Sequence, residues 1–196
     1  ASNNGKRVYI SNPESKNISI IDTKTLTNIK TIKIGSGPLA IAISPNDQSV
    51  YVADWYEDSI FIVDTASLLI RNKIKVGDSP SGLAVSPDGQ FLYVANRDEN
   101  TVMIINLSEN KIVDSIEVGI APFGLALNAK RNELYSANVR SNNVSVINLL
   151  TKKIMNIQVG NFPYAIAVDN IDERLFVTNQ RSNTVSVISL SEIKTV

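Results

Sequence analysis

The sequence of 196 residues contains no cysteine and no histidine. Without cysteine there can be no disulfide, no thiolate metal site and no cysteine nucleophile. Without histidine the chain lacks the commonest general base and the commonest metal ligand of proteins. We therefore expect no catalytic residue, no bound metal and no cofactor.

An excess of charge and a long apolar run are also missing. Lysine plus arginine and aspartate plus glutamate each number 19, so the formal net charge is zero. A balanced chain shows no electrostatic preference for nucleic acid, and no apolar run approaches the roughly 18 residues that span a bilayer. With 43% hydrophobic residues, we expect a packed globular body that binds no nucleic acid and does not span a membrane.

What the sequence does contain is an internal repeat. Segments similar to Leu92-Tyr93-Val94-Ala95-Asn96 end at Asn12, Asp54, Asn96, Asn138 and Asn179, in steps of 42, 42, 42 and 41 residues. Prolines 38, 80, 122 and 163 follow the same spacing, and a glycine stands three residues before each of them. Three markers in one register make coincidence an implausible explanation.

One period contains four strand-like runs separated by turn signals. Residues 82–85, 91–95, 101–105 and 111–118 are the runs, and Ser86-Pro87-Asp88-Gly89 forms the first turn. A four-stranded meander repeated at about 40 to 45 residues is the sequence signature of a propeller. We predict an all-β protein, a β-propeller of about five four-stranded antiparallel blades, forming a single domain or fragment. The predicted units are residues 1–37, 38–79, 80–121, 122–162 and 163–196.

The motifs of the repeat resemble a known family. Tyr93-Val94-Ala95-Asn96, the run from Thr101 to Asn106, and Ser86-Pro87-Asp88-Gly89 are similar to the YVTN family of β-propeller repeats, and the similarity covers nearly the whole chain. Members of this family are surface-layer or periplasmic proteins of archaea and bacteria, most often with seven blades. The resemblance implies an extracytoplasmic location, at the cell surface or in the periplasm.

The strand count indicates an incomplete ring. The first unit begins with its second strand, and residues 191–196 cover only about half of the fourth strand of the last unit. We expect a fragment of a longer, seven-bladed protein; a five-bladed ring and closure through a second chain are the alternatives. Open end blades would expose apolar faces and promote self-association.

Candidate binding residues gather in two sets of loops. In a propeller, the loops between second and third strands and the loops joining consecutive blades share one face, here named the channel-mouth face. Aromatic and arginine side chains, the types enriched at binding hot spots, are predicted to bind a protein or carbohydrate ligand there. They are Trp55, Tyr56, Arg97, Arg140 and Arg181 in the first set, and Phe123, Phe162 and Tyr164 in the second.

A structural role is the alternative for some of these residues. Phe123 and Tyr164 each follow the repeat proline, so packing between blades would explain them equally well. Trp55 and Tyr56 depart from the repeat and are therefore the stronger binding candidates.

Two polar features of the sequence are explained more simply by structural roles than by ligand binding. Asp54, Glu57 and Asp58 crowd one loop without the alternating pattern of a calcium loop, so we expect a solvated acidic loop. The asparagine that ends most second strands is expected to cap nearby backbone in the turn.

Together these observations favour a non-enzymatic binding or structural module outside the cytoplasm. The alternative is a propeller enzyme, a lyase or a relative of quinone-cofactor dehydrogenases, whose catalytic residues are carboxylates or tyrosine or lie in missing blades. A spacer without any ligand is a third option.

Overall fold

The computed structural model describes residues 1–169, 171 and 173–193, and its strands form five antiparallel sheets. Within each sheet, every strand pairs with the next one along the chain. The strands are β1 (Arg7–Asn12), β2 (Asn17–Asp22) and β3 (Asn28–Lys33); β4 (Pro38–Ile43), β5 (Ser49–Asp54), β6 (Ser59–Asp64) and β7 (Leu69–Lys75); β8 (Pro80–Val85), β9 (Phe91–Asn96), β10 (Thr101–Asn106) and β11 (Lys111–Glu117); β12 (Pro122–Asn128), β13 (Glu133–Asn138), β14 (Asn143–Asn148) and β15 (Ile154–Gln158); and β16 (Pro163–Asp169), β17 (Arg174–Asn179) and β18 (Thr184–Ser189).

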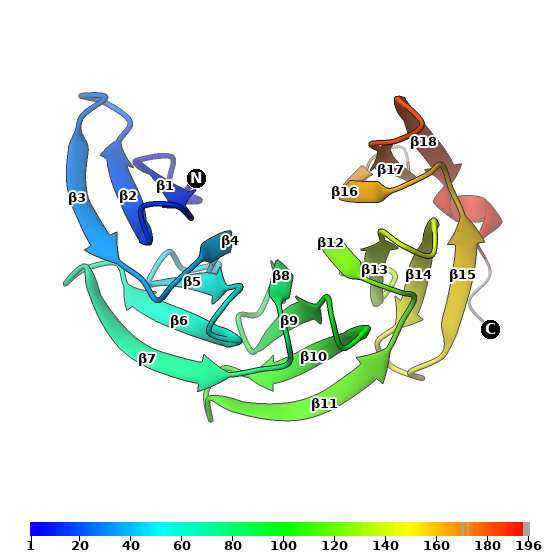
Figure 1. The fold of residues 1–196 in the computed structure, drawn as a ribbon, viewed down its shortest axis with the longest axis horizontal. Helices are drawn as coiled ribbons and strands as arrows, with labels where there is room; N and C mark the ends of the chain where they lie inside the picture. The colour runs from blue at the N-terminus through cyan, green and yellow to red at the C-terminus, as the bar shows by residue number, and fades with distance from the viewer. Residues whose placement is uncertain (170, 172, 194–196) are drawn as a thin grey trace.

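The sheets fan out as the blades of a propeller (Figure 1). Strands β4, β8, β12 and β16 lie toward the middle of the arc, and β3, β7, β11 and β15 lie on its outer side. The three central sheets have four strands each, and the first and last have three. The predicted all-β propeller of four-stranded antiparallel blades is confirmed.

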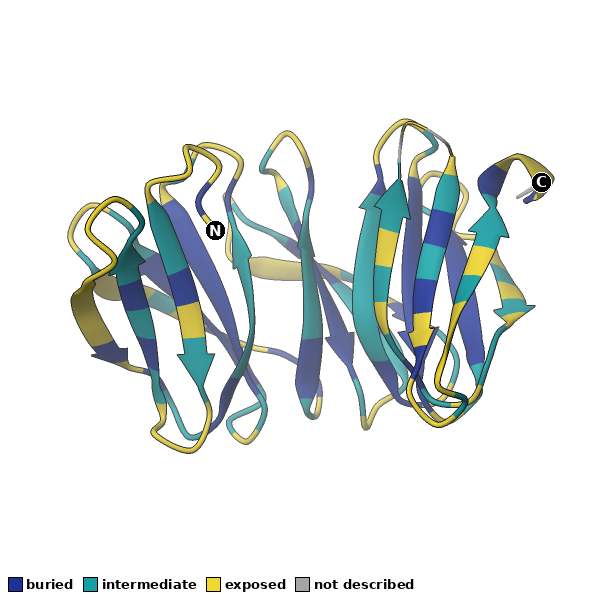
Figure 2. Ribbon diagram, turned by 90° about the horizontal axis from the view of Figure 1, so that it is seen from above, coloured by how far each residue is buried: buried dark blue, intermediate teal, exposed yellow. Residues whose placement is uncertain are grey.

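Each of the three inner blades is covered on both faces by its neighbours, and the alternation of side chains along a strand explains how. On β5, Val50 and Val52 pack against the first sheet, whereas Tyr51 and Ala53 pack against the third. All six residues of β5 are buried. Four such inter-blade cores follow one another along the arc, and Figure 2 shows the buried strands between exposed loops at both ends.

The two end blades lack this cover on one face. On β18 the side chains of Val185 and Val187 are 55% and 56% exposed, whereas Val144 and Val146 at the same register of β14 are fully buried. On β1, Ile10 is 44% exposed. Apolar faces therefore lie open at both ends of the arc.

The last unit corrects one prediction. Where half of a fourth strand was expected, Leu190–Glu192 forms a short 3-10 helix, η1, while residues 194–196 lie outside the described part. The fourth strands of the preceding units each follow a turn residue with positive φ, such as Leu68 and Lys152. Ile193 occupies that position with φ of −83°, because a β-branched residue resists positive φ. The positive-φ turn that precedes the fourth strands of the other units is therefore absent at Ile193.

The described helical structure consists of η1, which is three residues long and cannot cross a membrane.

Candidate functional site

The innermost strands share a local irregularity that sets the candidate site. In β4, β8, β12 and β16 the pairing with the next strand shifts register just after the repeat proline, for example between Pro122 and Leu125. A bulge of this kind leaves residues unpaired and redirects their side chains. Phe123 and Tyr164 lie inside two of these bulges.

Glycine allows neighbouring inner strands to come close together. A Cβ atom at Gly82 would collide with the backbone carbonyl oxygen of Phe123, and one at Gly124 would meet that of Tyr164. Because glycine has no Cβ, the backbones of β8, β12 and β16 can approach at these points. This approach brings the bulge residues of adjacent blades side by side.

Three aromatic rings from three blades meet at this place. The ring centroids of Phe123 and Tyr164 are 4.6 Å apart at an interplanar angle of 57°, and those of Trp55 and Phe123 are 6.4 Å apart at 49°. Tilted contacts at such distances are the favoured geometry for aromatic pairs. Trp55 comes from the loop after β5, so this aromatic cluster of Trp55, Phe123 and Tyr164 joins the second, fourth and fifth blades.

The aromatic cluster borders a groove along the inner strands. The groove has a volume of about 380 Å³, and Leu39, Ser81, Phe123 and Tyr164 are among the residues that line it. All three rings of the cluster are half-buried, and none of them belongs to the inter-blade cores found among the described residues. The apolar surface of Phe123 and Tyr164 therefore remains accessible from the groove.

Arginine adds charge beside the rings. The Arg97 guanidinium lies 5.4 Å from the centroid of Trp55 and pairs with Asp98 at 2.6 Å. Arg181 lies 3.7 Å from the centroid of Phe162, in a second cation–π pair. Arg97 is thus part of the surroundings of the aromatic cluster, and Phe162 with Arg181 forms a separate pair.

Two of the eight predicted residues stay apart from these groups. Tyr56 is 74% exposed, and its ring lies over Gly37 in the loop before β4. Arg140 is exposed, and its backbone N–H donates to the carbonyl of Ile120. The structure brings Trp55, Arg97, Phe123 and Tyr164 together, and a binding role for any of the eight remains a prediction.

The acidic loop differs from its predicted solvated state. Asp54 is fully buried and accepts hydrogen bonds from the backbone N–H groups of Ser36, Gly37, Tyr56 and Glu57. The predicted capping of backbone is confirmed at this position, where the carboxylate ties two loops of the channel-mouth face together.

The remaining acids of that loop form ion pairs. Glu57 pairs with Lys73 at 2.6 Å, and Asp58 pairs with Lys75 at 3.0 Å. The hydrogen bond from Lys73 lowers the pKa of Glu57 below its ordinary value. Across the part of the chain that the structure describes, no three acidic side chains gather to hold a metal ion.

The asparagines at the ends of the second strands act differently from Asp54. The side-chain amide of Asn138 donates to Asn143 and to the hydroxyl of Ser145, both at 2.8 Å, and Asn179 donates to Thr184 and Ser186. These bonds go to side chains of the third strand rather than to backbone. The expected backbone capping is therefore wrong for these asparagines, which join the second and third strands across their loop.

A separate cavity escaped the sequence analysis. It lies between the third and fourth blades, at the strand ends opposite the channel-mouth face, and measures about 570 Å³. Phe91 and Val113 are among its lining residues. The available signal was in the repeat, because Phe91 stands where the first blade carries Arg7 and Val113 stands where the second blade carries Arg71.

These features define a β-propeller module that presents an aromatic groove and a second cavity on a rigid array of blades. The sequence matches the model of the choice-of-anchor I domain over residues 2–195, and the chain belongs to this family. The family indicates a surface-anchored β-propeller module, in an extracellular or cell-surface protein. The narrower resemblance to YVTN repeats remains an expectation from the motifs.

Solved structures confirm the fold. Hydrazine synthase of Kuenenia stuttgartiensis is similar with a TM-score of 0.58 and 16% identity, over 94% of this chain and 92% of that one. The structure of U3-55K is similar with a TM-score of 0.87 and 19% identity, over 96% of this chain and 59% of that one. The chain thus spans just under three fifths of U3-55K. A search of curated proteins returned no significant match.

Proposed function

We propose that the chain is a non-enzymatic binding module, located outside the cytoplasm, that recognises a protein or carbohydrate partner through its channel-mouth face. The observation that carries this proposal is the aromatic cluster, in which Trp55, Phe123 and Tyr164 from three blades meet beside Arg97. Flat apolar rings with a forked cationic donor suit the faces of sugar rings and the side chains of a partner protein.

The surroundings of the cluster support a binding role. Its three rings are half-buried, and Phe123 and Tyr164 line a groove of about 380 Å³, which is within the usual range for ligand pockets. Asp54 holds the adjacent loops through four backbone hydrogen bonds, so the loop that carries Trp55 is fixed in advance. A preordered site loses less conformational entropy when its partner binds.

Fluorescence offers a direct test because Trp55 is the only tryptophan of the chain. A panel of glycans and surface proteins is titrated while the emission of Trp55 is followed, and each hit is measured again by calorimetry. We expect a hit whose affinity falls at least about tenfold in Arg97→Ala and, by calorimetry, in Trp55→Ala, as for hot-spot residues.

Leu26→Ala is the matched control because Leu26 is 80% exposed in a turn at the opposite ends of the strands. It should bind like the unchanged chain. A ligand that binds both Trp55→Ala and Arg97→Ala with full affinity would show that the channel-mouth face is not the site.

A further inference from the structure

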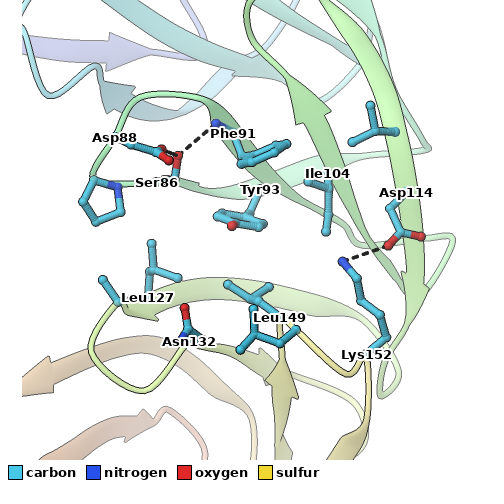
Figure 3. Close-up of a pocket in the computed structure, with 14 residues that line it drawn as sticks. Ser86, Asp88, Phe91, Tyr93, Ile104, Asp114, Leu127, Asn132, Leu149 and Lys152 are labelled. Atoms are coloured by element: carbon cyan, nitrogen blue, oxygen red, sulfur yellow. Dashed lines mark hydrogen bonds and ion pairs between the residues drawn. The ribbon is translucent and has the colours of Figure 1, made fainter.

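The cavity between the third and fourth blades is walled by apolar side chains. Figure 3 shows Phe91 and Tyr93 of β9 on one side and Leu127 and Leu149 of the fourth blade on the other. An ion pair between Asp114 and Lys152 lies at one end of the cavity. Its volume of about 570 Å³ is within the range of pockets that bind small ligands.

The same place in the other three inter-blade interfaces contains an arginine of the chain itself. Arg7 donates to the carbonyl of Thr65 at 2.6 Å between the first and second blades. Arg71 lies between the second and third blades and donates to the hydroxyl of Ser49 at 3.2 Å. Arg131 donates to the carbonyl of Ile193 at 2.9 Å between the fourth and fifth.

The third blade has no arginine at any of the three equivalent positions. Phe91 stands two repeats after Arg7, Val113 stands one repeat after Arg71, and Gly89 stands one repeat before Arg131. The cavities lined by Arg7 and by Arg71 measure about 260 and 300 Å³. The cavity without an arginine is therefore about twice as large as those that contain one.

The charged groups around this cavity are mainly carboxylates, which can accept hydrogen bonds from a cation. Asp88 and Asp114 both line it, and Asp114 pairs with Lys152 at 2.9 Å. The hydrogen bond from Lys152 lowers the pKa of Asp114, and the hydrogen bond from Ser86 lowers the pKa of Asp88. Both carboxylates are therefore ionised at neutral pH, and two negative charges against one positive charge leave the rim negative.

Tyr93 provides an additional polar group. Its counterpart Tyr135 donates its hydroxyl to Glu133 at 2.6 Å, but the residue equivalent to Glu133 in the third blade is Phe91. Tyr93 is 6% exposed and lines the cavity, and none of the groups that the structure describes forms a hydrogen bond with its hydroxyl. The hydroxyl is not among the buried polar atoms that lack a partner, so it is accessible from the cavity and can form a hydrogen bond with a ligand bound there.

We propose that this cavity binds an arginine side chain presented by a segment of a partner protein. The aliphatic stem packs against Phe91, Tyr93 and the facing leucines, and the carboxylates of the rim attract the guanidinium. The partner's arginine then takes the place that the chain's own arginines take in the other interfaces. This site is independent of the channel-mouth face.

Single-residue probes test the chemistry of the cavity. Binding of Nα-acetyl-arginine methylamide is measured by NMR titration beside the corresponding lysine and norleucine derivatives. We expect the arginine probe to bind at least about tenfold more tightly than norleucine, with lysine between them. Equal affinity of the arginine and norleucine probes, or no binding of the arginine probe, would overturn the proposal.

A pair of arginine substitutions tests the place of binding. Val113→Arg puts the arginine of the second blade into the cavity and should abolish binding of the arginine probe. Ile112→Arg is the control, because it adds the same charge to the preceding residue of β11. Ile112 is 42% exposed and lies outside the cavity lining. Undiminished binding by Val113→Arg would refute the site.

Asp114→Asn gives a second test that preserves size. It should weaken the arginine probe at least about fivefold and leave norleucine unaffected, since only the charge changes. Loss of both probes to the same degree would show that Asp114 acts through packing and would contradict the charge-based proposal. Trp55 fluorescence in the earlier glycan and protein titrations should be the same in all these variants. Each of the two proposals can therefore be refuted without affecting the other.

Discussion

Asp54 occupies a repeat position at which the other blades carry asparagine. A carboxylate with two oxygens can accept several backbone N–H groups at once, whereas an amide has one acceptor oxygen. Asp54 accepts four such bonds and holds the inter-blade loop before β4 against the loop after β5. This single change from amide to carboxylate therefore stiffens the loop that carries Trp55.

Removal of this carboxylate should lower the stability of the fold. We expect Asp54→Ala to lower the free energy of unfolding by about 3 kcal/mol, because buried N–H groups lose their acceptor, and Asp54→Asn to lower it by about half as much. Urea denaturation measures both values. Asp78→Ala, at an exposed position, should change stability by less than about 0.5 kcal/mol. A similar loss for Asp54→Ala and Asp78→Ala would contradict the role assigned to Asp54.

At the scale of the strand, a residue at one repeat position can be part of the core in one blade and dispensable in another. The difference depends on whether a neighbouring blade covers it. Val146 on β14 and Val187 on β18 share one register of the repeat. Val146 is fully buried against the fifth blade, whereas Val187 is 56% exposed on the open face of the last blade. Strand sequence alone does not separate them, since both face away from the preceding blade.

The valine pair yields a controlled prediction. Val146→Ala should lower the free energy of unfolding by about 2 kcal/mol, through lost burial and the cavity left behind. Val187→Ala should lower it by less than about 0.5 kcal/mol. Thermal and urea unfolding of the two variants provide the comparison. Equal losses would mean that the face of β18 is covered in solution.

At the scale of the whole molecule, the two open faces match each other. The exposed face of β18 corresponds to the face that each inner blade turns toward the next, and the exposed face of β1 corresponds to the face that receives it. Such surfaces are complementary but different, so they can join head to tail. Contact between them would bury side chains such as Val187 and Ile10.

We therefore expect the chain to self-associate as its concentration rises. Sedimentation velocity should show larger species in proportion to concentration, and Val187→Glu should suppress them, because a charge on the apolar face opposes its burial. Leu69→Glu, on the outer strand β7 where Leu69 is 60% exposed, is the control and should associate normally. A monomer at every accessible concentration would disprove this expectation.

Much of the fold was predictable because the repeat acts locally. Alternating apolar residues and turns such as Ser86-Pro87-Asp88-Gly89 set strands and hairpins within one unit, and three repeat markers set the number of units. The failure at Ile193 was also local in origin. Its apolar character fits a strand, but a β-branched residue disfavours the positive φ that the preceding turn needs.

The sequence by itself determined the blades, their strand order and the alternation that builds the inter-blade cores, because each depends on residues close together in the chain. Only the tertiary structure decided that Trp55 meets Phe123 and Tyr164, and that a cavity replaces the arginine of the other interfaces. Those outcomes depend on how bulged inner strands and successive blades are positioned in space. No local pattern of side chains encodes the distance between blades that are not neighbours.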